Sequence, residues 1–566
     1  MLPVRHPQYL GIVFLLGAQC SRTPPENTAR PEPAPRAGAT SQPEPDADVL
    51  DNGRAHPDSK SKRHRHGSSA GDSASRDTPP QAKRQPPAPD ATVKRPQTPR
   101  ARVDPSPAAK PHRIRHVAPG ELQAALNTAR PGDALVLQAG QTYRGPFTLP
   151  RKQGHGWIRI RGENADMASP DTRVSPRDAK HMPKLIAARA PVITAARGAH
   201  HYYLEHLEIT PAPDAKLTNL VVLGTRHTPT EAIPHHIIFR RCLLHGHPEH
   251  GTRRGIAMNS AHTAVVASHL SNFGVPGADS QAIAGWAGPG PFLIQNNTLV
   301  AAGENVMFGG AVCPAKARVP ADIRIHRNHL YKPLAWRERR RWNVKNLFEL
   351  KNARRVLVDG NLFENNWVHA QDGFAILLTV RNERGRVPWA AVRDVAFVNN
   401  IVRHSAAGIN ILGRDTNPHP SGRSERILIA NNLFDDIGGD RWGGSGTLFQ
   451  LLNGTRSIII EHNTAYQTGH VIIADGKPHH GFIFRHNVAP HNQYGIFGSG
   501  TGVGHKTLEH YFPGSVVENN VLAGGPARAY PSGNHFPRQL TPGNHSVREA
   551  GVDPKALLQA SQAARQ

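Results

Sequence analysis

A short apolar segment that ends in asparagine recurs along the second half of this sequence and constrains its fold more than any other feature. Each copy has three or four residues rich in apolar side chains, then one or two polar residues, then Asn. The terminal asparagines are Asn297, Asn328, Asn361, Asn400, Asn432, Asn463, Asn487 and Asn520, at intervals of 24 to 39 residues. Weaker copies end at Leu207, Cys242 and His269. Such a period is typical of a solenoid or a propeller.

Each repeat offers two or three short strands, whereas a propeller blade needs four. The pattern therefore favours a coil in which every strand pairs in parallel with its copies above and below. Asparagine suits a recurring corner because it tolerates the left-handed backbone region, and stacked amides can hydrogen-bond from coil to coil. We predict an all-β solenoid of roughly ten to twelve coils, monomeric, with these asparagines along one edge.

Two short helices are expected to cap the ends of the stack. After Pro119-Gly120, the apolar residues Leu122, Ala125 and Leu126 have helical spacing. A second helix is predicted over Pro554–Ala564, with Asp553 as its N-cap.

The first twenty residues have the pattern of an export signal. Arg5 and His6 precede an apolar run, Tyr9–Ala18, that is too short to span a membrane. Cys20 follows in a context that resembles a bacterial lipobox, in which the cysteine is lipidated, although Gln19 stands where a small residue is usual. Ordinary cleavage after Ala18 is the alternative. We expect an exported protein, either a lipoprotein of the outer membrane or cell surface or a secreted protein, with no membrane contact beyond a lipid anchor.

Residues 21–112 are predicted to be a disordered, Pro-rich tether. They contain no Phe, Trp or Tyr and almost no Leu or Ile, so they cannot bury enough apolar area to offset the loss of chain entropy. The solenoid is then assigned to residues 113–525, and a C-terminal cap and tail to 526–566.

Composition limits the partners. The formal net charge is +25, which favours acidic partners such as an anionic polysaccharide. The basic run Lys60–His66 is interpreted as solvated linker, and no nucleic-acid partner is expected. Three cysteines exclude a disulfide scaffold, and the 34 histidines show no spacing typical of a metal site.

Three strings carry a resemblance to a known fold family. They are Gly303–Gly310 (GENVMFGG), Lys345–Asn352 (KNLFELKN) and Gly408–Gly413 (GINILG). Together with the repeats, they resemble a bacterial group within the pectin-lyase-like superfamily of right-handed parallel β-helices. The resemblance implies that fold, and a choice among polysaccharide lyases, hydrolases, esterases, epimerases and non-enzymatic adhesins. Fold alone does not decide among them.

One strand downstream of each Asn corner is the expected place for chemistry. Aligning these strands puts Met307, Phe348, Ile376, Ile411, Phe449 and Ile473 in one core column. By alternation, Glu349 and Lys351 then point outward on the same side of one strand. Arg381 and Arg414 are expected on adjacent coils, with Asp279 and Glu304 in the loops of earlier coils.

A strip of acids and bases suits β-elimination on a uronic acid. The substrate carboxylate must be neutralised, by Arg or by Ca²⁺, before a base removes the neighbouring proton. The predicted catalytic residues are Lys351 or Arg381 as base, with Glu349, and Asp279 and Glu304 are candidate Ca²⁺ ligands. The alternative is that Glu349 and Lys351 form an ordinary surface ion pair.

Tryptophans near these strands suggest sugar contacts, because indole presents a broad apolar face. The expected substrate-binding residues are Trp336, Trp342, Lys345, Asn352, Trp367 and Arg414. The loop tryptophans, Trp389 included, could instead pack over the strands as a lid.

The sequence therefore predicts an extracytoplasmic polysaccharide-active protein, with a lyase favoured. A non-enzymatic carbohydrate-binding or surface-structural β-helix is the first alternative. A glycoside hydrolase is the second, but its one tight acidic pair, Asp435-Asp436, is interpreted as a turn.

Overall fold

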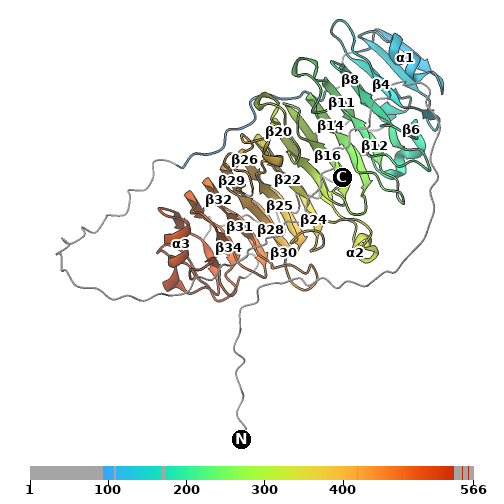
Figure 1. Ribbon diagram of the computed structural model, residues 1–566. Helices are drawn as coiled ribbons and strands as arrows, with labels where there is room; N and C mark the ends of the chain where they lie inside the picture. The colour runs from blue at the N-terminus through green and yellow to red at the C-terminus, as the bar shows by residue number, and fades with distance from the viewer. Residues whose placement is uncertain are drawn as a thin grey trace, which may run out of the picture. The chain divides into compact units, whose positions relative to one another are not determined.

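The computed structural model describes residues 93–540, except 107–109, 168–171 and 417, together with residues 551 and 559. All strands of the described residues belong to three long sheets, which we name A, B and C. Successive coils lie side by side along one axis, with α1 (Leu122–Thr128) in the first coils and α3 (His505–Tyr511) in the last (Figure 1). A further short helix, α2 (Ala335–Arg339), lies in a central loop.

Fourteen strands form sheet A. In spatial order they are β1 Arg113–Val117, β2 Asp133–Leu137, β5 Ile158–Gly162, β8 His200–Glu205, β11 His235–Arg240, β14 Ala261–Val266, β17 Phe292–Gln295, β20 Ala321–His326, β23 Ala353–Asp359, β26 Val392–Val398, β29 Glu425–Ala430, β32 Arg456–Glu461, β35 His480–Arg485 and β38 Val516–Glu518.

Thirteen strands form sheet B. They are β3 Thr142–Arg144, β6 Lys184–Ala187, β9 Glu208–Pro211, β12 Leu243–His245, β15 His269–Phe273, β18 Thr298–Ala301, β21 His329–Tyr331, β24 Leu362–Asn366, β27 Ile401–Ser405, β30 Leu433–Ile437, β33 Thr464–Gln467, β36 Val488–Pro490 and β39 Val521–Ala523.

Twelve strands form sheet C. They are β4 Phe147–Leu149, β7 Ile193–Ala195, β10 Asn219–Val222, β13 Arg254–Ala257, β16 Gln281–Gly285, β19 Glu304–Phe308, β22 Phe348–Leu350, β25 Phe374–Thr379, β28 Ala407–Leu412, β31 Phe449–Leu452, β34 Ile472–Asp475 and β37 Ile496–Gly498.

The chain visits sheets A, B and C in turn, so each coil adds one strand to each sheet, and neighbouring strands are parallel. Crossovers between parallel strands take the right-handed sense that L-amino acids favour. The fold is a right-handed parallel β-helix, as predicted. Twelve coils carry a strand in all three sheets within the described residues, which agrees with the expected number.

The asparagine ladder exists, but the left-handed residue is the one before each ladder Asn. Asn399 (φ 56°) and Asn431 (φ 57°) are left-handed, and the ladder residues Asn400 and Asn432 follow them. The Asn400 amide Nδ2 donates to Asn432 Oδ1 at 3.1 Å and to the Val358 carbonyl at 3.0 Å. The same bonds repeat from Asn297 to Asn520 and end on Asn534.

At its N-terminal end the ladder changes residue type. Ser268 donates its backbone N–H to Asn297 Oδ1, and Cys242 donates its own to Ser268 Oγ. The corner position of that coil is therefore Ser268, and the alignment that ended this weak copy at His269 was wrong by one residue. Ser268 has a hydroxyl in place of the asparagine amide, so the recurring asparagines could not identify it as the corner residue.

The interior of the coil is filled by apolar columns. Val306, Phe348, Ile376 and Ile409 lie at matched positions on consecutive strands of sheet C and are fully buried. At the start of the stack, Leu122, Ala125 and Leu126 of α1 are buried as the helical spacing predicted. Among the residues described, no helix is long and apolar enough to cross a membrane.

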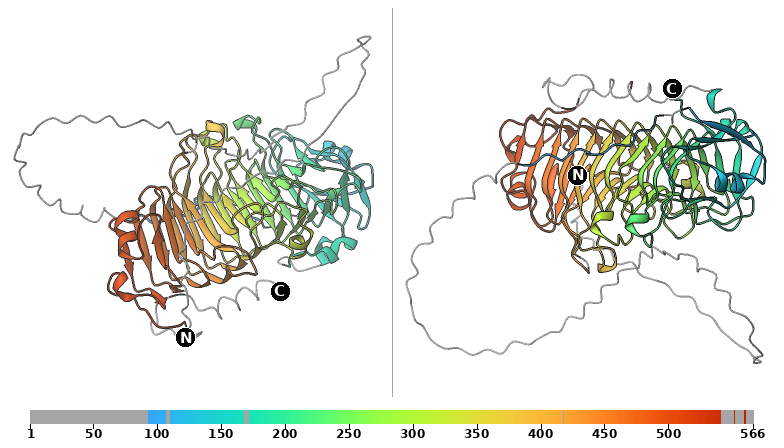
Figure 2. Two further views of the ribbon diagram at one scale, coloured as in Figure 1. Left: turned by 60° about the horizontal axis from the view of Figure 1, so that its bottom comes forward. Right: turned by 90° about the horizontal axis from the view of Figure 1, so that it is seen from above.

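Residues 93–106 correct one predicted boundary. They were assigned to the tether, yet they form an extended segment, here called the strap, that crosses the strands of sheet A from late coils toward early ones (Figure 2, right). Arg95 pairs with Glu461, and the backbone N–H groups of Gln97 and Arg100 donate to Asp394 and Asp322. A chain poor in apolar residues is ordered here because these three carboxylates, themselves partly buried, accept its hydrogen bonds.

Other predicted segments lie outside the described residues. They are the export signal with Cys20, the tether from Ser21 to residue 92, and all of the predicted C-terminal helix Pro554–Ala564 except residue 559.

The ladder generates a stability prediction. Asn400→Ala removes the acceptor of two donors of Asn361, its backbone N–H and its Nδ2. Because buried donors without acceptors are costly, we expect a loss of unfolding free energy on the order of 2–4 kcal/mol. Thermal unfolding followed by circular dichroism measures the loss.

The neighbouring Asn399→Gly is the matched control. Glycine keeps the left-handed backbone that Asn399 adopts, and only an exposed hydrogen bond to Asp359 disappears. An equal decrease in the unfolding midpoint for both variants would contradict a stabilising role of the ladder.

Candidate functional site

A cluster of carboxylates and cations lies around the central strands of sheet C. Glu349 and Lys351 are separated by one residue at the end of β22, and Lys351 Nζ lies 3.5 Å from Glu349 Oε1. The two side chains therefore face the same side, as alternation predicted. Glu349 is only 1% exposed, whereas Lys351 is 14% exposed. The carboxylate is thus buried beneath an ammonium that reaches the surface.

Arg381 joins this pair from the next coil. Its backbone N–H donates to the Lys351 carbonyl at 3.0 Å, which places the two residues on adjacent coils. Its guanidinium is 48% exposed and lies 3.4 Å from the Asp415 carboxylate. Arg381 is therefore the most accessible cation of the cluster.

A second part of the cluster joins Lys345, on the coil of β22, to carboxylates from the two preceding coils. Lys345, just before β22, contacts Asp279, and its Nζ lies 3.8 Å from Glu304 Oε1. Glu304 is the first residue of β19 and not a loop residue as expected. Gln281 Nε2 donates to Glu304 Oε2 at 2.7 Å. The Lys345 ammonium thus bridges the two carboxylates that were predicted to hold Ca²⁺.

Burial perturbs the acids of this cluster. Burial, reinforced by the charge of Asp279, raises the pKa of Glu304 to about 7, against the attraction of Lys345. Burial also raises the pKa of Glu383, although Lys351 and Arg381 oppose it. Buried acids with shifted pKa values beside cations are typical of functional sites.

The pKa of Lys351 shifts upward. Burial would lower it, but the negative charges of Glu349 and Glu304 outweigh burial and raise it above its ordinary value. Lys351 is therefore an ammonium at neutral pH, and acting as a base requires it to lose that proton first.

Two buried oxygens in β22 and just before it lack hydrogen-bond partners. They are Glu349 Oε2 and Asn346 Oδ1. The other oxygen, Glu349 Oε1, accepts from Thr379 Oγ1 at 3.3 Å. Unpaired buried acceptors are costly, so this place is suited to a ligand that donates hydrogen bonds.

The strand alignment was correct for β25, which spans Phe374–Thr379 and pairs Ile376 with Phe348 as predicted, but wrong for β19 and β28. Phe348 pairs with Val306, so Met307 lies in the outward column beside Glu349. In β28, Ile376 pairs with Ile409, two residues before the predicted Ile411. Val306, Met307 and Phe308 are all apolar, and Ile409 and Ile411 lie two residues apart, so hydrophobicity could not fix either register.

This shift moves Arg414 out of the predicted column. Leu412 pairs with Thr379, and Arg414 lies beyond the strand, with its guanidinium donating to the Ser421 carbonyl. Its neighbour Asp415 is the residue that contacts Arg381. Asp415 and Glu383 were not predicted from the sequence, because both follow their strands in loops of unequal length. The only available signal was their closeness in sequence to Arg414 and Arg381.

The tryptophans mainly pack over the strands and expose little indole surface to a sugar. Trp367 is 3% exposed and packs with Val344, Ala406 and Trp442. Trp342 is 7% exposed. The partly exposed Trp336 contacts the Trp367 group and, with Trp342, lines a cavity of about 130 Å³. Asn352 is also buried, and its Oδ1 accepts the Ala391 backbone N–H.

A larger cavity, about 840 Å³, lies on sheet B, away from this cluster. Asp435, Asp436 and Tyr466 are among its lining residues. The acidic pair lies within β30 and not in a turn, and Asp436 accepts hydrogen bonds from His404 and Trp442. We place the candidate site on sheet C because several carboxylates and cations contact one another there. Beside the sheet B cavity, in contrast, Asp436 is held by hydrogen bonds from His404 and Trp442.

Comparisons with known proteins place the fold in context. An alginate lyase from Paenibacillus sp. str. FPU-7 aligns at 13% identity and a TM-score of 0.33, over 69% of this chain and 98% of that chain. A mannuronic acid specific polysaccharide family 6 lyase from human gut microbiota aligns at 12% and 0.42, over 80% and 99%. A GH87 α-1,3-glucanase from Streptomyces thermodiastaticus strain HF3-3 aligns at 13% and 0.41, over 76% and 68%. These likenesses concern the fold alone. No protein-family model and no curated protein matches the sequence.

The raised pKa of Glu304 predicts a pH-dependent stability. Since the pKa is higher in the folded state, its stabilising contribution is full below the ordinary value of 4.5 and is lost as the pH rises toward about 7. Glu304→Gln keeps an acceptor for Gln281 and removes this loss. We expect the variant to gain on the order of 2–3 kcal/mol relative to wild type between pH 4.5 and pH 8.

Thermal unfolding of both proteins in EDTA, at pH 4.5, 6 and 8, measures this gain. The exposed carboxylate of Glu338 provides the control, because Glu338→Gln should leave the pH profile unchanged. A constant difference between Glu304→Gln and wild type at all three pH values would show that Glu304 has no raised pKa.

Proposed function

We propose that this protein acts on an anionic polysaccharide and that the sheet C cluster catalyses β-elimination on a uronic acid residue. The observation that carries the proposal is the pair of accessible cations, Lys351 and Arg381, on adjacent coils above the buried Glu349. The formal net charge of +25 supports an anionic substrate.

In the proposed reaction, Arg381 binds the carboxylate of the uronic acid, which makes the proton on the neighbouring carbon more acidic. Lys351, once deprotonated, removes that proton. The bond between the next ring carbon and the glycosidic oxygen then breaks, its electrons leave with the oxygen, and a carbon–carbon double bond forms. The departing oxygen takes a proton, so that charge and atoms balance. Glu349 positions Lys351 through the ion pair.

Calcium does not fit the two predicted ligands as they lie here. The Lys345 ammonium contacts Asp279 and lies near Glu304, where a bound cation would have to sit. Like charges at that distance repel strongly in a buried place. The proposed reaction therefore uses no metal ion, and we expect it to persist in EDTA.

The proposal predicts that the protein generates new ultraviolet absorbance from uronic-acid polysaccharides, because elimination creates a double bond conjugated to the carboxylate. Activity should be assayed at alkaline pH, because the raised pKa of Lys351 leaves little of its side chain as free amine at pH 7. Lys351→Met should lower the rate by at least about 100-fold, which is typical for loss of a general base, while binding of the polysaccharide persists.

Lys477→Met, at an exposed position on a late coil, is the matched control and should retain full activity. Polysaccharide binding without new absorbance would overturn the lyase proposal in favour of a carbohydrate-binding β-helix. Shortened chains without absorbance would indicate hydrolysis, for which Asp435 and Asp436 beside the 840 Å³ cavity are the carboxylates to test.

We also propose that the protein is exported and anchored through a lipid on Cys20, which rests on the sequence pattern of its first twenty residues. Wild-type protein expressed in a bacterial host should enter the detergent phase in Triton X-114 partitioning. Cys20→Ser should remain in the aqueous phase. Identical partitioning of the two proteins would show that Cys20 carries no anchor.

A further inference from the structure

Two neighbouring strands of sheet A each begin with a pair of histidines. His200 and His201 begin β8, and His235 and His236 begin β11. The parallel register places His235 beside His200. The column continues into β14, where His262 stacks on His236 with ring centroids 4.4 Å apart. The repeat thus gathers imidazoles that are 26 to 62 residues apart in the sequence.

The backbone brings the rings of each pair together. In a regular strand, consecutive side chains point to opposite faces and do not meet. Here His201 (φ 58°) and His236 (φ 53°) are left-handed. As a result, the Nδ1 atoms of His200 and His201 lie 2.8 Å apart, and those of His235 and His236 lie 2.7 Å apart.

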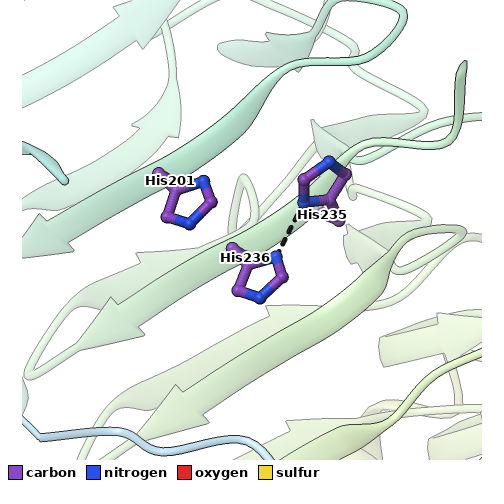
Figure 3. Close-up of side chains that lie close together, drawn as sticks. All are labelled: His201, His235 and His236. Atoms are coloured by element: carbon purple, nitrogen blue, oxygen red, sulfur yellow. Dashed lines mark hydrogen bonds between the residues drawn. The ribbon is translucent and has the colours of Figure 1, made fainter. Parts of the chain in front are cut away.

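The pairs also contact each other across the coil boundary. His201 stacks on His236 with centroids 4.6 Å apart and planes 3° from parallel. One ring nitrogen from each of His201, His235 and His236 lies within 4.8 Å of the other two. Figure 3 shows the three rings grouped between the two strands, with the hydrogen bond between His235 and His236 dashed. Within the described part of the chain, this is the one group of three or more His, Cys, Asp or Glu side chains whose ligand atoms lie close enough to hold a metal ion.

The hydrogen-bond network indicates which nitrogens carry lone pairs. His200 Nε2 lies 3.1 Å from the Lys152 carbonyl, a contact that requires a proton on Nε2. In the tautomer of His200 that carries its proton on Nε2, Nδ1 is an acceptor, and His201 donates to it through its own Nδ1–H. This leaves Nε2 of His201 with its lone pair.

The ring of His201 is neutral at pH 7, because burial, together with the neighbouring imidazoles of His200, His235 and His155, lowers its pKa to about 4. Trp157 packs against His201 at 5.2 Å between ring centroids. A ligand set made only of imidazole suits Zn²⁺, Ni²⁺ or Cu²⁺ and not the oxygen-seeking Ca²⁺ or Mg²⁺.

We propose that His201, His235 and His236 bind a transition-metal ion, Zn²⁺, Ni²⁺ or Cu²⁺, on sheet A, separately from the carboxylate cluster on sheet C. Metal–nitrogen bonds of about 2.0–2.1 Å place tetrahedral ligands about 3.3 Å apart, so small ring rotations bring the three nitrogens into place. The bound ion links two coils, and a fourth position stays open for water or an external ligand.

Isothermal titration of the EDTA-treated full-length protein with ZnCl₂ tests this proposal. Wild type should bind one Zn²⁺ tightly, and the double variant His201→Asn/His236→Asn should lose at least about tenfold in affinity at that site. Asparagine is chosen because it tolerates the left-handed backbone of both positions. Bound Zn²⁺ should also raise the unfolding temperature of wild type and not that of the double variant.

His462→Asn is the matched control. His462 is likewise left-handed (φ 55°) and stacks on His486 with centroids 4.7 Å apart, but it belongs to no group of three. It should bind Zn²⁺ as wild type does. Equal affinity in wild type and the double variant would overturn the proposal, as would failure of wild type to bind Zn²⁺, Ni²⁺ and Cu²⁺.

Electron paramagnetic resonance of wild type with one equivalent of Cu²⁺ tests the site in the wild-type protein alone. The result therefore does not depend on whether a variant folds. Splitting from several imidazole nitrogens is expected. A spectrum typical of oxygen ligands alone would contradict the site. Neither measurement depends on polysaccharide activity, so failure of the lyase proposal leaves this one standing.

Discussion

The asparagine ladder fixes the register of one coil on the next, and the other features of this protein depend on that register. Each ladder amide donates both to the amide of the next coil and to a carbonyl of the preceding coil, as Asn400 does with Asn432 and Val358. A buried amide with all its partners holds its corner in one place, because any slip would leave several polar groups unpaired. Strands of three to seven residues can then stack in columns without long loops to guide them.

A fixed register places residues of the same kind next to one another on successive coils. Such a row can destabilise the stack, and it can also build a site. Residues at one position of successive coils lie about 5 Å apart, so a recurring charged or aromatic residue becomes a row. The protein alternates signs along one such row on sheet A, where Arg355 pairs with Asp322 and Arg426 with Asp394. The strap lies across the same row. Earlier in that row the residues are His201, His236 and His262, which stack as neutral rings.

On sheet C the same principle gathers opposite charges in a largely buried place. Glu304 and Glu349 are almost fully buried, and each lies beside a lysine, Lys345 or Lys351. Burying charges costs several kcal/mol for each ion unless the pairing is good. The raised pKa of Glu304 shows that the pairing here is incomplete. Stability alone does not explain such an arrangement, whereas a site that receives a charged ligand does.

Much of this was predictable from the sequence because it depends on local periodicity. The repeat, the parallel coil, the ladder and the helix around Leu122 follow from spacing alone, whereas spacing left open whether each coil has two strands or three. So does the common face of Glu349 and Lys351, since two residues of one short strand separated by a single residue must point the same way. The chemistry proposed for sheet C rests on that inference.

Other features depend on contacts between coils and were decided only by the tertiary structure. The apolar segment Val306–Phe308 and the two isoleucines Ile409 and Ile411 allow several registers, so only packing against β22 and β25 places Met307 beside Glu349 and moves Arg414 away. The bridging position of Lys345 and the order of the strap depend on carboxylates contributed by distant coils. The histidine group required both a left-handed backbone and the parallel register. The sequence by itself determined the repeating unit; the stacking of the units determined which side chains meet, because side chains from different coils are brought together only by the pairing of whole strands.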